Sequence, residues 1–342
     1  MNKKTHRNLA LFAAVFAVVV VVLGAFTRLS DAGLGCPDWP GCYGFMHIPT
    51  KSEHIEKANA AFPEQPYEFH KAWPEMVHRY FAGTLGLLVL ALAIISFRSQ
   101  QKFTFKHSTF LLVLVIFQAA LGMWTVTMKL HPSIVMLHLL GGITTLSLLA
   151  SLTLRYHFAD RKNQLIKVKN SLKWLVIFSL IIVTLQVALG GWTSANYAAL
   201  VCHKLPVCQG NWLQDGDFIS AFQFWGGKAD TYEYGILQQD ARIAIHASHR
   251  IGAFIASFTL LALIFQLIRL TEYKLFQRIG YIVLALLITQ IVLGVNNIVF
   301  KLPLFNAVAH NAVGALLVVS MVCLLTLILI AKPTIKEVTD GK

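Results

Sequence analysis

Four histidines are the residues of this sequence best suited to metal chemistry. They are His78, His138, His249 and His310, and each lies near the start of a long apolar segment. Ionisable side chains at membrane depth are energetically costly and by default have a function. Two imidazoles that face each other across a helix bundle suit the axial positions of a six-coordinate haem iron. The four histidines therefore predict two haem sites, one for each pair.

Small residues beside these histidines favour a flat macrocycle over a bare metal ion. They lie about one turn along the same helical face and are Ala82, Gly83, Gly141, Gly142, Gly252, Ala253 and Gly314. Close packing of membrane helices through small residues is the alternative explanation at any single position. Their recurrence after all four histidines favours haem.

An arginine directly follows two of the histidines. Arg79 and Arg250 are expected near the outer membrane surface, where a guanidinium can pair with the carboxylates of a porphyrin. Alternatively, both side chains extend their charge to the interface without a ligand. The sequence leaves both interpretations open.

One carboxylate distinguishes the first histidine pair from the second. Glu75 lies three residues before His78, whereas His246 occupies the same place before His249. Residues three apart project from one side of a helix, so Glu75 is expected close to the first site. A carboxylate there can accept a proton or stabilise positive charge while a porphyrin substituent is oxidised. Acids are also favoured electrostatically at helix N-termini, but the asymmetry predicts a catalytic role for Glu75.

Membrane helices must hold these residues in place. The chain has 342 residues, of which 56% are hydrophobic and only 13% are charged, which is too apolar for a soluble protein. Runs of about 20 apolar residues can cross a bilayer. We expect spans at Leu9–Arg28, His78–Phe97, Ser108–Thr127, Ile134–Leu154, Trp174–Thr193, Ile245–Ile268, Phe276–Val299 and Leu304–Ala331. The net charge of +13 does not indicate nucleic-acid binding, because the basic residues lie between the apolar runs and not on one face.

The distribution of lysine and arginine predicts the orientation. With an even number of spans both termini lie on one side, and the connectors on that side are rich in basic and poor in acidic residues. The positive-inside rule makes that side cytoplasmic. We therefore expect a multi-pass protein of a bacterial cytoplasmic (inner) membrane, with long outward loops at 29–77 and 194–244.

The two outward loops contain four of the five cysteines. Cys36 and Cys42 lie in the first loop, and Cys202 and Cys208 lie in the second. Paired cysteines outside the membrane imply an oxidising compartment and two short-range disulfides. Structural staples are favoured over redox-active pairs, and the spacing lacks the CxxC pattern of zinc sites. Cys323 in the last span is expected to serve packing.

The chain contains an internal repeat. A shift of 166 residues superimposes the two cysteine pairs, and shifts of 171 and 172 superimpose the two histidine pairs. Units of four spans share their orientation, which makes the repeat parallel. The sequence thus predicts an all-α polytopic membrane protein of two pseudo-symmetric four-helix bundles. Its parts are an N-terminal unit at 1–155, a cytoplasmic linker at 156–173 and a C-terminal unit at 174–342.

In combination, these motifs resemble the haem A synthase family. The motifs that carry the resemblance are the run from Gly24 to Cys42, Glu75-x-x-His78-Arg79, Gln186-x-x-Leu-Gly-Gly-x-Thr193, His249-Arg250 and His310. The resemblance extends from the first span to the last. It implies an enzyme that oxidises the C8 methyl group of haem O to a formyl group, through successive hydroxylations, and so supplies haem A to terminal cytochrome oxidase.

The resemblance also implies roles for individual residues. In that family the N-terminal unit is taken as the substrate site and the C-terminal unit as the site of haem b. Carried over, His78 and His138 hold haem O, His249 and His310 ligate haem b, and Glu75 is the catalytic carboxylate. The implied partners are a haem O synthase (a farnesyltransferase) that delivers the substrate, and cytochrome oxidase assembly factors.

The loop from Tyr43 to Trp73 is a modest departure from the family pattern. It is long and carries His47, His54 and His70, which we interpret as solvated loop residues. An additional lid or a partner surface is the alternative for this loop.

Two other functions compete with the synthase interpretation. A di-haem b-type electron-transfer cytochrome accounts for four histidines but not for a glutamate opposite His246. A transporter made of parallel repeats would use histidines to bind protons or substrate. Such a transporter predicts helices interrupted at the midplane, whereas these histidines lie near the outer ends.

Overall fold

The computed structural model describes residues 3–98, 102–159, 168–227, 229–270 and 273–331. Within these ranges eight helices are long and apolar enough to cross a membrane, which confirms the predicted all-α membrane architecture. They are α1 (Lys3–Leu29), α3 (Phe69–Arg98), α4 (Lys102–Thr127), α5 (Pro132–His157), α6 (Asn170–Ala195), α9 (Gln239–Arg269), α10 (Lys274–Val299) and α11 (Leu304–Ile330). The centre of the predicted linker, at 160–167, lies outside the described residues.

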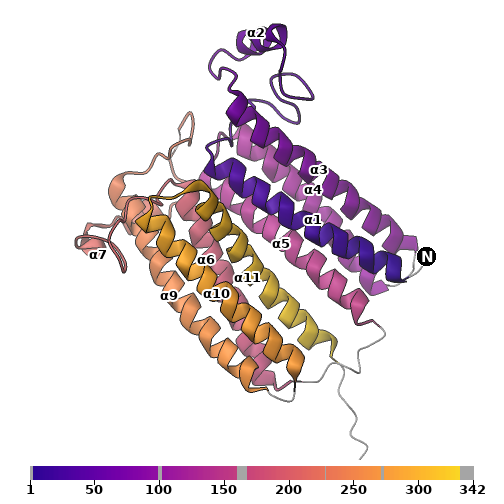
Figure 1. Ribbon diagram of the computed structural model, residues 1–342. Helices are drawn as coiled ribbons and strands as arrows, with labels where there is room; N and C mark the ends of the chain where they lie inside the picture. Colours follow the sequence, from indigo (N-terminus) through magenta and orange to yellow (C-terminus); the bar gives the residue numbers. More distant parts are fainter. Residues whose placement is uncertain (1–2, 99–101, 160–167, 228, 271–272, 332–342) are drawn as a thin grey trace, which may run out of the picture.

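The long helices form two adjacent groups of four (Figure 1). In the first group contacts run around a ring from α1 to α3, α4, α5 and back to α1. In the second they run from α6 to α9, α10, α11 and back to α6. The groups meet through α5 and α11, with further contacts from α1 to α11 and from α5 to α6. Each group thus encloses its own interior.

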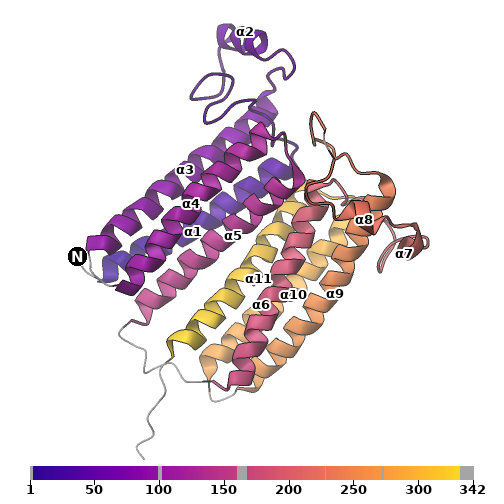
Figure 2. The same ribbon diagram turned by 180° about the vertical axis from the view of Figure 1, so that it is seen from behind.

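Both long loops emerge at the same end of the molecule (Figures 1 and 2). The first contains the short helix α2 (Ser52–Ala61), and the second contains α7 (Trp212–Asp215) and α8 (Phe218–Ala221). Helix α1 begins at the opposite end of the molecule (Figure 1). This arrangement is the one expected from an even number of spans.

Two helices begin earlier than the apolar runs predict. The spans expected from His78 and Ile245 belong to helices that start at Phe69 and Gln239. His78 and His249 therefore lie well inside α3 and α9 and not in their first turns, which corrects the predicted starts. A count of apolar residues detects only the part of a helix in hydrocarbon, whereas these helices continue as polar turns beneath the loops.

The packing has the character of a membrane protein. Each group has its own buried apolar cluster, with Val89 and Leu149 in the first and Leu263 and Met321 in the second. Small side chains at Ala10, Ala13 and Ala17 let α1 approach its neighbours closely. Large apolar side chains are exposed around the outside, including Leu87, Phe110, Ile116 and Phe258. These outward faces suit contact with lipid.

Candidate haem site

His78 and His138 face each other inside the first group of helices. Their ring centroids are 6.4 Å apart and their planes are nearly perpendicular, at 89°. Histidine–metal bonds are about 2 Å long, so two rings on opposite sides of one metal have centroids roughly 6 Å apart. The observed separation fits axial ligation of a single iron.

His249 and His310 form the corresponding pair in the second group. They lie on α9 and α11, which are opposite each other in the second ring of helices. Two glutamines approach them. The Gln186 amide nitrogen lies 3.0 Å from His249 Nδ1, and that of Gln290 lies 3.3 Å from His310 Nε2. Both histidine pairs predicted from the sequence are thus brought together by the fold.

Each histidine ring packs against a glycine of the long helix before it. A Cβ atom built on Gly24 would lie 2.8 Å from His78 Cε1, and one on Gly190 would lie 3.1 Å from His249 Cε1. The same relation holds for Gly122 with His138 and for Gly294 with His310. Any larger residue at Gly24 would force the ring of His78 to move.

Unpartnered nitrogens support a bound group between the histidines. The Nδ1 atoms of His78, His138 and His310 are buried and have no hydrogen-bond partner in the structure. Buried polar atoms without a partner are costly and call for a ligand or another explanation. Within the described ranges, no cluster of three or more His, Cys, Asp or Glu side chains could hold a metal ion. A porphyrin, which brings four equatorial nitrogens and needs only two axial ligands, fits this donor set.

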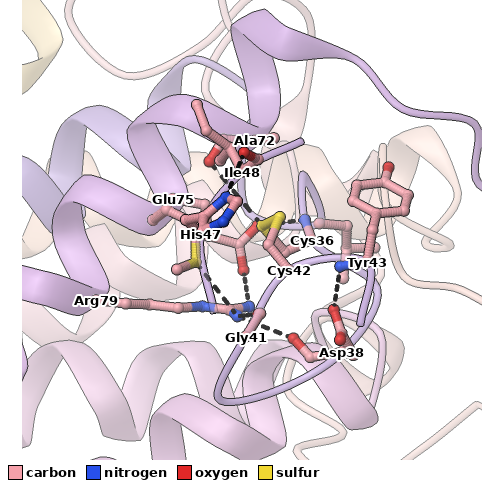
Figure 3. The surroundings of a disulfide bond; sticks show 12 residues. Cys36, Asp38, Gly41, Cys42, Tyr43, His47, Ile48, Ala72, Glu75 and Arg79 are labelled. Atoms are coloured by element: carbon pink, nitrogen blue, oxygen red, sulfur yellow. Dashed lines mark hydrogen bonds and ion pairs between the residues drawn. A yellow bond between two sulfur atoms is a disulfide. The ribbon is translucent and has the colours of Figure 1, made fainter. Parts of the chain in front are cut away.

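Glu75 lies between its helix and the first disulfide loop (Figure 3). Its side chain is buried, with 4% of the residue exposed. The carboxylate accepts a hydrogen bond of 2.9 Å from the backbone nitrogen of Cys36 and forms an ion pair with Arg79 on the next turn. The predicted Cys36–Cys42 disulfide is present. The glutamate is therefore held by one loop and one arginine.

Arg79 connects this glutamate to the loop (Figure 3). Besides Glu75, it donates hydrogen bonds to the carbonyls of Asp38, at 2.9 Å, and Gly41. Asp38 in turn accepts hydrogen bonds from the backbone nitrogens of Tyr43 and Gly44. These bonds hold the loop against α3.

Arg250 has the equivalent position in the second half. Its Nε lies 3.1 Å from His246 Nε2, and its terminal nitrogens donate to the carbonyls of Cys202, Lys204 and Val207. The predicted Cys202–Cys208 disulfide closes that loop. Glu75 and His246 therefore occupy equivalent positions in the two halves, each paired with the arginine four residues later, but one is an acid and the other an imidazole. The loop carbonyls as arginine partners were not foreseen, because no residue type in the sequence marks a backbone acceptor.

The long first loop is more ordered than a solvated connector. Tyr43 packs edge-on against Phe62 and Tyr67 and donates a hydrogen bond to the carbonyl of Pro66. Burial, reinforced by the nearby charge of Glu68, raises the pKa of Tyr43 to about 12. The loop therefore has a small core of its own.

The loop histidines divide into two kinds. His47 and His70 are exposed, as expected. His54 is half-buried and stacks on Phe45 at 4.7 Å between centroids, so the expectation that it is solvated was wrong. Its helix, α2, could not be anticipated from an apolar pattern.

Comparison with known proteins agrees with this geometry. The family model of COX15-CtaA, described as cytochrome oxidase assembly protein, matches residues 7–322. A protein of Shewanella oneidensis named heme A synthase is 45% identical over 311 residues, covering 90% of this chain and 92% of its own length. A heme A synthase of Halalkalibacterium halodurans is 24% identical and covers 95% of this chain and 98% of its own length. With a family match over most of its length, the chain belongs to the COX15-CtaA family of cytochrome oxidase assembly proteins.

Proposed function

We propose that this protein is a haem A synthase, a membrane oxidoreductase that converts the C8 methyl group of haem O to a formyl group. The observation that carries the proposal is the facing pair His78 and His138, with Glu75 one turn away, in a chain 45% identical to a heme A synthase. An electron-transfer cytochrome has no use for a buried glutamate at only one of two sites.

The two halves are assigned different tasks. The N-terminal unit, 1–155, holds the substrate haem O through His78 and His138. The C-terminal unit, 174–342, holds haem b through His249 and His310, and the linker at 156–173 joins them. A bound haem b supplies a one-electron redox centre. Contact of Arg79 and Arg250 with haem propionates stays a prediction for both residues.

Glu75 is assigned the proton chemistry. Conversion of a methyl to a formyl group with water as the oxygen source releases four electrons and four protons, and the electrons pass to an acceptor of the membrane. Glu75 lies three residues before His78 on α3 and is held by Arg79 and the Cys36 backbone nitrogen. It is the carboxylate placed to accept protons and to stabilise positive charge at the substrate.

The proposal includes a cellular setting. The termini face the cytoplasm and the disulfide loops face outward from a bacterial inner membrane, in agreement with the basic connectors and the paired cysteines. A haem O synthase supplies the substrate, and cytochrome oxidase assembly factors receive the product. The loop at 43–73, with its own core, is the surface we assign to such a partner.

Replacement of Glu75 tests this assignment. Glu75→Gln should abolish haem A formation while haem O and haem B still bind, because no histidine changes. Glu68→Gln, in the neighbouring loop, is the matched control and should retain activity. Pigments extracted from the purified protein and identified by chromatography and mass give the answer. Wild-type haem A yield from Glu75→Gln would refute the role.

The pigment of the unaltered protein separates the competing functions. Haem B together with haem O, haem A or a hydroxylated intermediate is expected from cells that also make haem O synthase. Two haem B molecules per chain and no other haem would instead identify an electron-transfer cytochrome. A colourless protein would exclude both functions.

A further inference from the structure

Glutamines accompany three of the four histidines. Gln118, Gln186 and Gln290 each lie four residues before the glycine that their histidine contacts. In α1 the same place, four residues before Gly24, is occupied by Val20. His78 is thus the one histidine of the four that faces no glutamine across its glycine helix.

The glutamines are held in direct contact with the histidine helices. The Gln186 amide lies 3.0 Å from the ring of His249 and donates a hydrogen bond of 2.9 Å to the His249 carbonyl. The Gln290 amide lies 3.3 Å from the ring of His310. The amide nitrogen of Gln118 is buried without a partner. It is therefore an unused donor beside the helix that carries His138.

A glycine makes room for each glutamine. A Cβ atom on Gly141 would clash with the amide of Gln118, and one on Gly252 would clash with that of Gln186. A Cβ on Gly314 would lie 3.3 Å from the amide of Gln290. These glycines lie three or four residues after their histidines.

Around His78, the positions that correspond to the glutamine and its glycine are apolar instead. The residues three and four positions after it are Phe81 and Ala82, and both pack against the cluster that includes buried Val20. Phe81 also stacks on Phe16, with centroids 5.4 Å apart. At His78, therefore, Val20 takes the place of the glutamine and Phe81 takes the place of its glycine.

Side-chain partners of a ligating imidazole fix the orientation of its ring and strengthen its bond to the metal. We propose that Gln118, Gln186 and Gln290 are positioning residues for the three histidines that they face, and that His78 is the exchangeable ligand through which the substrate haem would enter and leave. This inference rests on the proposed function. It explains how one protein keeps haem b, which has two amide-supported ligands, and yet releases the haem that it modifies.

Conversion of the His78 surroundings to the pattern of the other sites tests the proposal. The double variant Val20→Gln/Phe81→Gly, purified with haem O bound, should release haem O to apomyoglobin about tenfold more slowly than the unaltered protein, within the range typical of such partners. The reciprocal variant Gln186→Val should release haem B about tenfold faster. Its spectrum should lose low-spin, bis-histidine character. Both readouts are independent of turnover.

A matched control separates these effects from general loosening. Gln277 lies on α10 and bonds the carbonyl of Ile268, far along the chain from any of the four histidines. Gln277→Val should leave both release rates unchanged. Unchanged haem O release in the double variant, or equal haem B release in Gln186→Val and Gln277→Val, would overturn the inference. Where the double variant does not fold, the single variant Val20→Gln takes its place in the haem O measurement, and unchanged haem O release would overturn the inference in the same way.

Failure of the proposed function would look different. His138→Ala should lose haem O from the first site. If His138→Ala retains haem O, or if no haem O binds to the unaltered protein, the assignment of the substrate site is wrong and the inference falls with it. If His138→Ala loses haem O while Val20→Gln/Phe81→Gly releases it at the unaltered rate, only the role of the glutamines is refuted.

Discussion

Arg79 compensates the charge of Glu75 and also holds the first disulfide loop in place. A buried carboxylate is stable only when its charge is compensated, and here an arginine and one backbone nitrogen supply the compensation. The same arginine holds the loop through its carbonyls. Loss of Arg79 should therefore affect both stability and catalysis.

Arg79→Met is expected to lower the free energy of unfolding by about 3 kcal/mol, because the Glu75 charge stays buried without its partner. The double variant Glu75→Gln/Arg79→Met should recover part of that loss, since no uncompensated charge remains. Unfolding titrations in mixed detergent micelles measure both values. Equal loss in the single and double variants would contradict a charge-based explanation.

Tyr43 offers a test outside the membrane. Burial raises its pKa from about 10 to about 12, so the folded protein retains the phenol proton at pH values where the unfolded chain has lost it. Stability from this group is complete below pH 10 and is lost as the pH rises toward 12. Ultraviolet titration should show a tyrosinate component near pH 12 that is absent in Tyr43→Phe. If Tyr43→Phe instead removes a titration step near pH 10 and leaves the curve near pH 12 unchanged, the Tyr43 phenol is not buried.

Much of the site at this scale follows from the sequence. Membrane depth marks the four histidines, and the repeat aligns Glu75 with His246. The partners of Arg79 and Arg250 do not follow, because backbone carbonyls become acceptors only once a loop has its conformation. The contacts between histidines and glycines depend on how each helix is rotated about its own axis. Apolar runs do not specify this rotation when apolar residues occupy most faces of the helix.

At the scale of elements, the disulfide loops act as caps on the helices that carry the sites. The first loop contacts α3 at Glu75 and Arg79, and the second contacts α9 at Arg250. Prediction of all eight long helices succeeded because bilayer thickness imposes their length. The sequence did not predict the starts of α3 and α9 or the short helices α2, α7 and α8. Contacts with the loops stabilise these segments, and their sequences carry no periodic pattern of apolar residues.

Removal of the first disulfide should impair catalysis more than haem binding. Cys36→Ser/Cys42→Ser frees a loop whose closure contributes about 2 kcal/mol, and it loosens the backbone nitrogen that bonds Glu75. Haem A yield should fall severalfold while haem B content stays constant. Cys202→Ser/Cys208→Ser is the matched control, and it should affect haem B retention first. The reverse pattern would show that the loops do not act on separate sites.

At the scale of the whole molecule, side-chain hydrogen bonds join the two groups of helices both near the long loops and between the helices themselves. Arg28 of α1 donates to the Tyr197 hydroxyl, at 2.9 Å, and to the carbonyl of Ser194, at 2.7 Å. Ser151 and Thr326 share a buried hydrogen bond of 2.8 Å between α5 and α11. The stacking of His131 on Trp225 adds a contact between the α4–α5 connector and the second long loop. The sequence repeat predicts two units but contains no signal for these contacts.

Arg28→Ala should destabilise the pair of units by about 2 kcal/mol, the value typical of hydrogen bonds to a charged group. Arg98, which is exposed at the C-terminal end of α3, is the control, and Arg98→Ala should have little effect. Thermal denaturation in detergent, followed by circular dichroism, measures both. Equal melting temperatures for Arg28→Ala and the unaltered protein would show that helix packing alone joins the units.

The arginine contacts with the disulfide loops also have a consequence for biogenesis. Each disulfide loop precedes the arginine that binds its carbonyls, and these contacts can form only once the loop has its closed conformation. The helices need only lipid to form, whereas the capped sites need a thiol oxidant as well. Cells without that oxidant should therefore accumulate inserted but haem-poor protein. Maturation of this protein would thus report the redox state of the compartment in which its loops fold.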